Sequence, residues 1–176
     1  MKVPKMWKNV LDWAEKNVGK AIGGHFEIIE NSNNMLKHLV DMDGKAAKSL
    51  AVIGDNGADN VFCIWQKDKK NMPVVMLGEA SSARVTAENM DDFIQLLAVG
   101  YYEIETVDFT LEPTFSEGAE YWENTEFQAF YQKKFKQEIP KMGAEIVARI
   151  TTPNADFLIG CVIMMMVGGS GGCNLN

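Results

Sequence analysis

The spacing of hydrophobic and polar positions between residues 73 and 100 predicts two strands followed by a helix. Pro73–Leu77 is a continuous apolar run rich in valine, and its short length favours a buried strand over a helix. Arg84–Glu88 alternates apolar and polar positions, which is typical of a strand with one buried face. The turn residues between the two runs predict a hairpin with a loop of about five residues.

The helix that follows carries signals at both ends. The side chain of Asn89 is expected to accept a hydrogen bond from a free N–H of the first turn, and Asp91 and Asp92 lie where the helix dipole favours negative charge. Gly100 is expected to adopt the left-handed conformation that ends the helix. The apolar positions, which together form a wide face that must pack on the sheet, are Met90, Phe93, Ile94, Leu96 and Leu97.

The remaining pattern predicts a mixture of strands and helices. Strands are expected at His25–Glu30, at Leu50–Ile53 ending at Gly54, at Val61–Lys67, and, with a bulge or bend, at Tyr101–Leu111. Helices are expected at Met6–Val18, at Met35–Val40, from a Thr125/Gln128 capping box to Ile139-Pro140, at Gly143–Ile150, and from near Asn154. The fold class that follows is α+β, a twisted and mainly antiparallel sheet of five or six strands with helices packed on it.

The length of 176 residues fits a single domain. We assign this domain to residues 1–167 and expect residues 168–176, which include the run GGSGG, to form a flexible glycine-rich tail.

The stretch PVVMLGEASSARVTAENMDDFIQLLAVGY resembles a segment shared by the SUKH superfamily, with its PVV-x-LG strand, V-x-A strand and N-x-x-D-F-L-x-L-L-A-x-G-Y helix. Upstream, residues 53–68 resemble the family's glycine-and-aspartate turn and the strand with a tryptophan, here Trp65. A helix followed by an N-G-G turn, as in the family, is not evident. The positions that carry the match are Pro73, Val74, Val75, Leu77, Gly78, Val85, Ala87, Asn89, Asp92, Phe93, Leu96, Leu97, Ala98, Gly100 and Tyr101.

The resemblance implies an α+β fold and, for most bacterial members of the family, a role as an immunity protein. Such a protein binds and neutralises a toxin. We therefore expect this chain to be a SUKH-like immunity or protein-binding module rather than an enzyme.

Charge is concentrated in the middle of the chain. Residues 79–126 hold 12 acidic residues and one arginine, whereas residues 1–78 hold 11 lysines and 9 acids, and residues 127–176 hold 5 basic residues and 3 acids. So acidic a segment repels nucleic acid and anionic membrane and attracts a basic partner, such as a nuclease toxin, although a solvated surface is an equal alternative. The candidate binding residues are Glu79, Glu88, Glu103, Glu105, Asp108 and Glu117, with Tyr102 and Trp122 as aromatic anchors.

Motifs for catalysis or cofactor binding are missing from the sequence. His25 and His38 belong to no metal-binding pattern, the Asp55–Gln66 segment lacks the sixth-position glycine of a calcium loop, and we expect neither a metal nor a cofactor. An enzyme would need one of the histidines to meet a carboxylate in a cleft. A small-ligand-binding or regulatory domain with a pocket on the concave sheet face is the alternative function.

Three sequence features favour the cytoplasm. Cys63, Cys161 and Cys173 are odd in number and form no disulfide or zinc pattern. No secretory signal is visible at the N-terminus. The longest apolar run, Phe157–Val167, is far shorter than the roughly 20 residues that a bilayer span requires.

Overall fold

The computed structural model describes residues 3–29, 49–57, 60–68, 72–78, 83–113 and 124–153. The helices expected at Met35–Val40 and from near Asn154 lie outside these ranges, as do the apolar run Phe157–Val167 and the glycine-rich tail.

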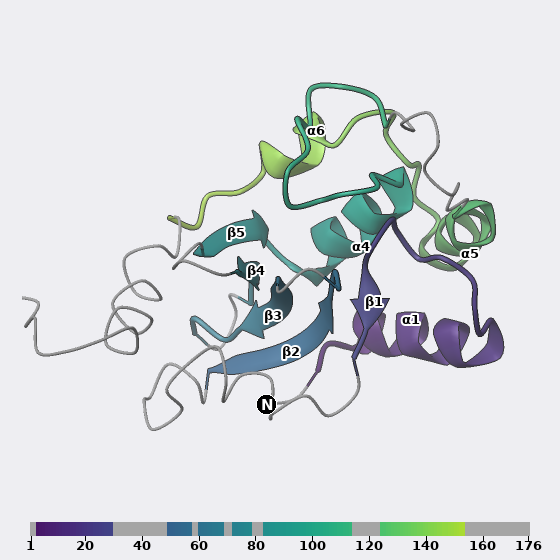
Figure 1. Ribbon diagram of the computed structural model, residues 1–176, viewed down its shortest axis with the longest axis horizontal. Helices are drawn as coiled ribbons and strands as arrows, with labels where there is room; N and C mark the ends of the chain where they lie inside the picture. The colour runs from purple at the N-terminus through teal and green to yellow at the C-terminus, as the bar shows by residue number, and fades with distance from the viewer. Residues whose placement is uncertain are drawn as a thin grey trace, which may run out of the picture.

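Within the described residues the sheet has five antiparallel strands in the order β1-β2-β3-β4-β5, so each strand pairs with its neighbour in the chain (Figure 1). This arrangement confirms the predicted fold class and the hairpin. From β2 to β5 the connections are short and favour such an order, because antiparallel neighbours need only a turn to join them. The strands are β1 (Glu27–Ile28), β2 (Leu50–Asp55), β3 (Val61–Trp65), β4 (Val74–Leu77) and β5 (Ala83–Ala87).

Four helices of the described chain pack on this sheet and on each other (Figure 1). Two of them match the predictions closely, since one covers most of Met6–Val18 and another lies between Asn89 and Gly100. No helix within the described ranges is both long and apolar enough to cross a membrane. The helices are α1 (Lys5–Lys16), α4 (Met90–Val99), α5 (Thr125–Phe135) and α6 (Ala144–Val147).

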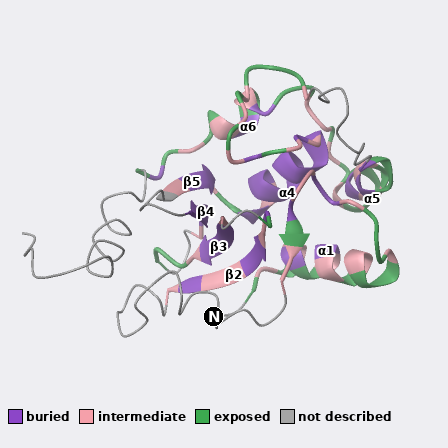
Figure 2. Cartoon of the chain, in the orientation of Figure 1, coloured by how far each residue is buried: buried purple, intermediate pink, exposed green. Residues whose placement is uncertain are grey.

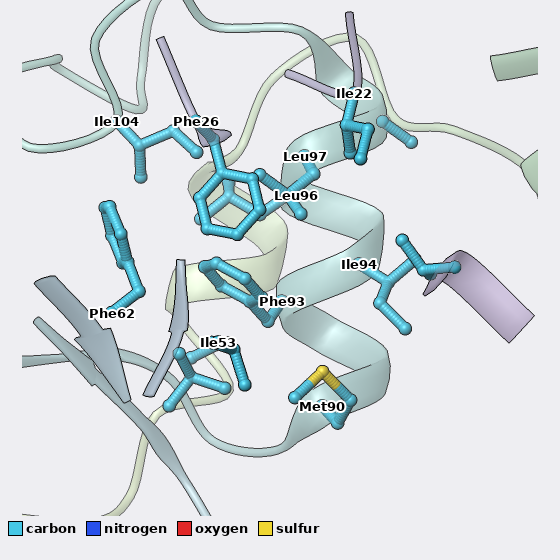
Figure 3. Close-up of a cluster of buried hydrophobic side chains, with 14 of the residues drawn as sticks. Ile22, Phe26, Ile53, Phe62, Met90, Phe93, Ile94, Leu96, Leu97 and Ile104 are labelled. Atoms are coloured by element: carbon cyan, nitrogen blue, oxygen red, sulfur yellow. The ribbon is translucent and has the colours of Figure 1, made fainter. Parts of the chain in front are cut away.

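Helix α4 lies at the centre of the molecule, and nine of its ten residues are buried (Figure 2). Its ends follow the sequence prediction: the side chain of Asn89 accepts a hydrogen bond from the Asp92 N–H at 3.0 Å, and Gly100 has a φ of 90°. Phe93 packs against the rings of both Phe26 and Phe62, with centroids 5.5 and 5.7 Å away (Figure 3). The predicted apolar face therefore forms the core of the fold.

Both faces of the central strands β3 and β4 are buried. Phe62 and Met76, which pair across these strands, point into the core that α4 and the other helices share. Cys63 and Val75, which pair on the opposite face, have no exposed surface. This two-sided burial explains why β4 reads as an unbroken apolar run instead of an alternating one.

Strand β2 runs one residue past Gly54, where the sequence suggested an end. A β-carbon at Gly54 would lie 2.4 Å from both the Glu27 carbonyl oxygen and the ring of Phe26. The glycine is thus required inside the strand, because it lets β1 and Phe26 approach β2 closely.

The strand predicted at Tyr101–Leu111 is wrong, since this segment forms turns. The backbone N–H of Val107 donates to the carbonyl of Glu103, and the Asp108 carboxylate accepts from the N–H and hydroxyl of Thr110. These local hydrogen bonds compete with strand pairing. Ile104 is nevertheless buried, and Val107 and Phe109 pack against the core, whereas Leu111 is exposed.

The capping box predicted for α5 is also wrong. Thr125 is the first residue of the helix, and Asn124 precedes it without capping it through its side chain. The Asn124 amide instead donates to the carbonyls of Ile22 and Leu97, at 3.2 and 3.0 Å.

The C-terminal ends of α5 and α6 also differ from the predicted ends. Helix α5 ends before Lys136, which has a φ of 56°, instead of continuing to Ile139-Pro140. Helix α6 is much shorter than the predicted Gly143–Ile150.

Replacing Leu97 with alanine should lower the free energy of unfolding by about 2–5 kcal/mol, because the side chain is completely buried on the apolar face of α4. The matched control is Leu111→Ala, since the Leu111 side chain is 60% exposed. Chemical denaturation of both variants measures the difference. Equal losses of stability would mean that this face of α4 is not part of the core.

Candidate binding site

A close backbone contact fixes the segment after α4 against the segment before β1. The N–H of His25 donates to the carbonyl of Tyr102 at 2.9 Å, and the two rings lie with their centroids 3.9 Å apart. Gly24 has a φ of 48°, and a β-carbon there would lie 2.1 Å from the Tyr102 carbonyl oxygen. Only glycine fits at this position, both sterically and conformationally.

Four carboxylates gather around this contact, and we call them the acidic edge: Glu27, Asp55, Glu103 and Glu105. Glu27 and Asp55 are direct partners in the pairing of β1 with β2. The next residue, Asn56, donates from its side chain to the Glu105 carboxylate at 2.6 Å. Glu103 is exposed and follows Tyr102 directly. Three segments that are distant in the sequence thus supply one acidic surface.

The positive charges near this surface already interact with groups of the chain, and Arg84 does so with Glu105 of the acidic edge as well as with a carbonyl. Arg84 donates to the carbonyl of Ile104 at 2.6 Å; burial lowers the pKa of its guanidinium, and the charge of Glu105 works against this effect. Lys20 makes an ion pair of 2.7 Å with Glu126. Within the described part of the chain, none of the four carboxylates of the acidic edge makes an ion pair. Because Glu27 and Asp55 face each other across paired strands, their charges repel, and a cation would relieve this repulsion.

An open hollow of about 700 Å³ lies beside the acidic edge. The last turn of α1, residues 17–22, residues 24–28 and the turn at Asn56-Gly57 line it. The hollow therefore shares Glu27 with the acidic edge, and Asn56 in its lining donates to Glu105 of that edge. Its size is in the range of sites that hold small ligands or short peptide segments. It lies next to strand β1, not on a concave face of the sheet.

The structure brings three of the residues proposed from sequence together, because Tyr102, Glu103 and Glu105 all belong to the segment at the acidic edge. They do not share a strand face, since the segment is not a strand. Asp108 lies farther along this segment, and hydrogen bonds from Thr110 lower the pKa of its carboxyl group. Glu79, Glu117 and Trp122 lie outside the described residues.

Glu88 has a structural role. Its carboxylate accepts hydrogen bonds from the N–H groups of Thr151 and Thr152, at 2.8 and 2.9 Å, and from both hydroxyls. Partial burial works to raise the pKa of Glu88, but the hydrogen bonds from Thr152 and Thr151 outweigh it and lower the pKa. This carboxylate anchors the chain after α6 to the end of β5, and both of its oxygens already accept hydrogen bonds within the chain.

Sequence reasoning missed Glu27, Asp55, Asn56 and His25 as parts of the site. The turn at Asp55 drew attention only as an incomplete calcium loop. No local signal links Asn56 to Glu105, because they are 49 residues apart and meet only when β2 and the segment after α4 pack against the same core. The charge count pointed to residues 79–126, whereas two of the four carboxylates lie upstream of that range.

Groups with reactive potential are few in the described part of the chain. The Cys63 thiol is completely buried, and burial raises its pKa, so it stays protonated and unreactive. Within the described ranges, no three His, Cys, Asp or Glu side chains are placed to hold a metal ion. His25 packs against Tyr102, and His38 lies outside the described residues.

No protein-family model, curated protein or solved structure matches the chain.

Replacing Gly24 with alanine should disrupt the site, whereas Gly57→Ala serves as a matched control. Gly57 also has a positive φ, of 69°, but nothing lies within 4 Å of an added β-carbon. The control should cost only the conformational strain of about 1–2 kcal/mol. Because of its additional collision with Tyr102, Gly24→Ala should cost about 2 kcal/mol more and should speed hydrogen exchange at the His25 amide. Equal losses in the two variants would contradict the close contact.

Proposed function

We propose that this chain is a SUKH-like immunity or protein-binding module that neutralises a basic protein partner by covering its surface with the acidic edge. The observation that carries the proposal is the convergence of Glu27, Asp55, Glu103 and Glu105 from three segments, without an ion pair to any described cation. Such a surface attracts a complementary positive surface and speeds its diffusional association.

The resemblance to the SUKH superfamily supports the same proposal. Strands β4 and β5 and helix α4, between Val74 and Val99, follow each other in the order that the resemblance implies. A nuclease toxin is a suitable partner, because an enzyme that binds phosphate groups needs a basic cleft. An acidic protein blocks such a cleft by occupying the place of the nucleic acid.

Tyr102 fits the proposal as an aromatic anchor. It is half-buried, and its ring is held by the contact with His25. Fixed aromatic rings are common at the energetic centre of protein interfaces, because little side-chain entropy is lost when they bind.

Binding of a small ligand is the second candidate function, and the hollow beside β1 favours it. The apolar part of its lining comes from residues such as Ile22, Phe26 and Ile28, with His25 and Asn56 as polar groups. This combination is typical of small-molecule sites. The position of the hollow next to the acidic edge makes partner binding the stronger proposal, since one interface then uses both features.

The double variant Glu27→Lys with Glu103→Lys should reduce the association rate with the partner by about tenfold or more at low salt, because it reverses two exposed charges of the acidic edge. Neither carboxylate takes part in an ion pair with a described residue, and the Thr106 hydroxyl that donates to Glu103 is exposed and can bond to water instead, so the fold should persist. Glu105 is left unchanged, since it accepts from Asn56 and faces Arg84. The first partner to test is the product of the reading frame adjacent to the gene.

The matched control is Glu138→Lys with Glu145→Lys, which changes the net charge equally at exposed positions near α6. Stopped-flow or surface-based kinetics at several salt concentrations should show a normal rate and a normal salt dependence for this control. If both double variants slow association equally, only the net charge matters, and the acidic edge is not the binding surface.

A further inference from the structure

The hollow beside the acidic edge has an apolar floor and an apolar rim. Ile22 and Phe26 are buried at its base, and Ile28 is partly buried against the core. At the rim lies Val18, just after the C-terminal end of α1, with 88% of its surface exposed. A large apolar side chain that lines an open hollow and remains in water gains free energy when an apolar group covers it.

Negatively charged side chains lie in and beside the lining of the hollow. Glu27 lines the hollow directly, and Asn56, which also lines it, connects to Glu105. Asp55 is the strand partner of Glu27. Lys20, which also lines the hollow, is held by Glu126 in an ion pair. A group entering the hollow therefore meets apolar side chains inside it and carboxylates at its side.

We propose that this hollow receives a short segment of the partner in which apolar residues stand between lysines or arginines. The inference rests on the proposed function and adds to it the part of the partner that is recognised. The apolar residues cover Val18 and Ile28, and the cations lie against Glu27 and Asp55. A volume of about 700 Å³ suits several residues of such a segment better than a single side chain.

A peptide segment fits this site better than a neutral small molecule, because the two features lie side by side. A neutral ligand uses the apolar lining alone and leaves the repulsion between Glu27 and Asp55 unrelieved. Alternating apolar and basic groups satisfy both features at once, and a peptide supplies this alternation within a few residues.

Four tetrapeptide amides test the proposal: Lys-Leu-Leu-Lys, Lys-Ser-Ser-Lys, Gln-Leu-Leu-Gln and Glu-Leu-Leu-Glu. Titration of the full chain, followed by the amide resonances of Val18, Ala21 and Ile28, measures binding to the hollow. Lys-Leu-Leu-Lys should bind at least about fivefold more tightly than each of the others. No shift with any peptide, equal shifts with Lys-Ser-Ser-Lys, or equal shifts with Gln-Leu-Leu-Gln would each overturn the proposal; the last would indicate a site for neutral ligands.

Two variants separate this inference from the proposed function. Val18→Asn removes an exposed apolar side chain without touching the core, and it should weaken Lys-Leu-Leu-Lys about fivefold while Lys-Ser-Ser-Lys stays the same. If Val18→Asn binds peptide and partner normally while Glu27→Lys with Glu103→Lys loses the partner, the proposed function stands and the inference about the hollow fails. If the charge reversal has no effect on the partner either, both fail.

Discussion

The burial of α4 on nearly all sides is the constraint on which the rest of the structure depends. A buried helix needs partners for every polar group it carries, since an unpaired buried group costs about 1–3 kcal/mol. Near its N-terminal end, Arg149 donates to the carboxylate of Asp92 at 2.7 Å. At its C-terminal end, the side-chain amides of Asn124 and Gln128 donate to the carbonyls of Leu97 and Ala98, both at 3.0 Å. Residues from the C-terminal part of the described chain therefore supply hydrogen-bond partners for the polar groups of α4.

The same constraint places the candidate site. Asn124 connects the end of α4 to Ile22, and a β-carbon at Gly23 would lie 2.8 Å from the Leu97 carbonyl oxygen, so the segment before β1 must pass directly against the helix. Gly100 ends α4 next to this segment. Tyr102, two residues later, therefore contacts the segment directly through His25. The C-terminal end of α4, where the helix dipole is negative, directly precedes Tyr102 and Glu103 in the chain and adds a small negative contribution there.

Local signals predicted most of the fold. The apolar run of β4, the Asn89 cap and Gly100 each act within a few residues, and so the hairpin and α4 could be read directly from the sequence. The segment after α4 could not, because its alternation is typical of a strand. The backbone hydrogen bond from Val107 to Glu103 and the bond from the Thr110 N–H to the Asp108 carboxylate fold it into turns instead. Half of the acidic edge was missed for a different reason: Glu27 and Asp55 join Glu105 only through tertiary packing, which leaves no mark on local spacing.

Hydrogen exchange of the complex with the partner tests the central claim most directly, because it needs no mutation and reports on the whole surface. Comparison of the free and bound chain should show new protection in residues 18–28, 55–57 and 101–106, which combine the acidic edge and the hollow beside it. Helices α5 and α6 should exchange as in the free protein. Protection confined to those helices, with residues 18–28 and 101–106 unchanged, would contradict the account and place the binding surface elsewhere on the fold.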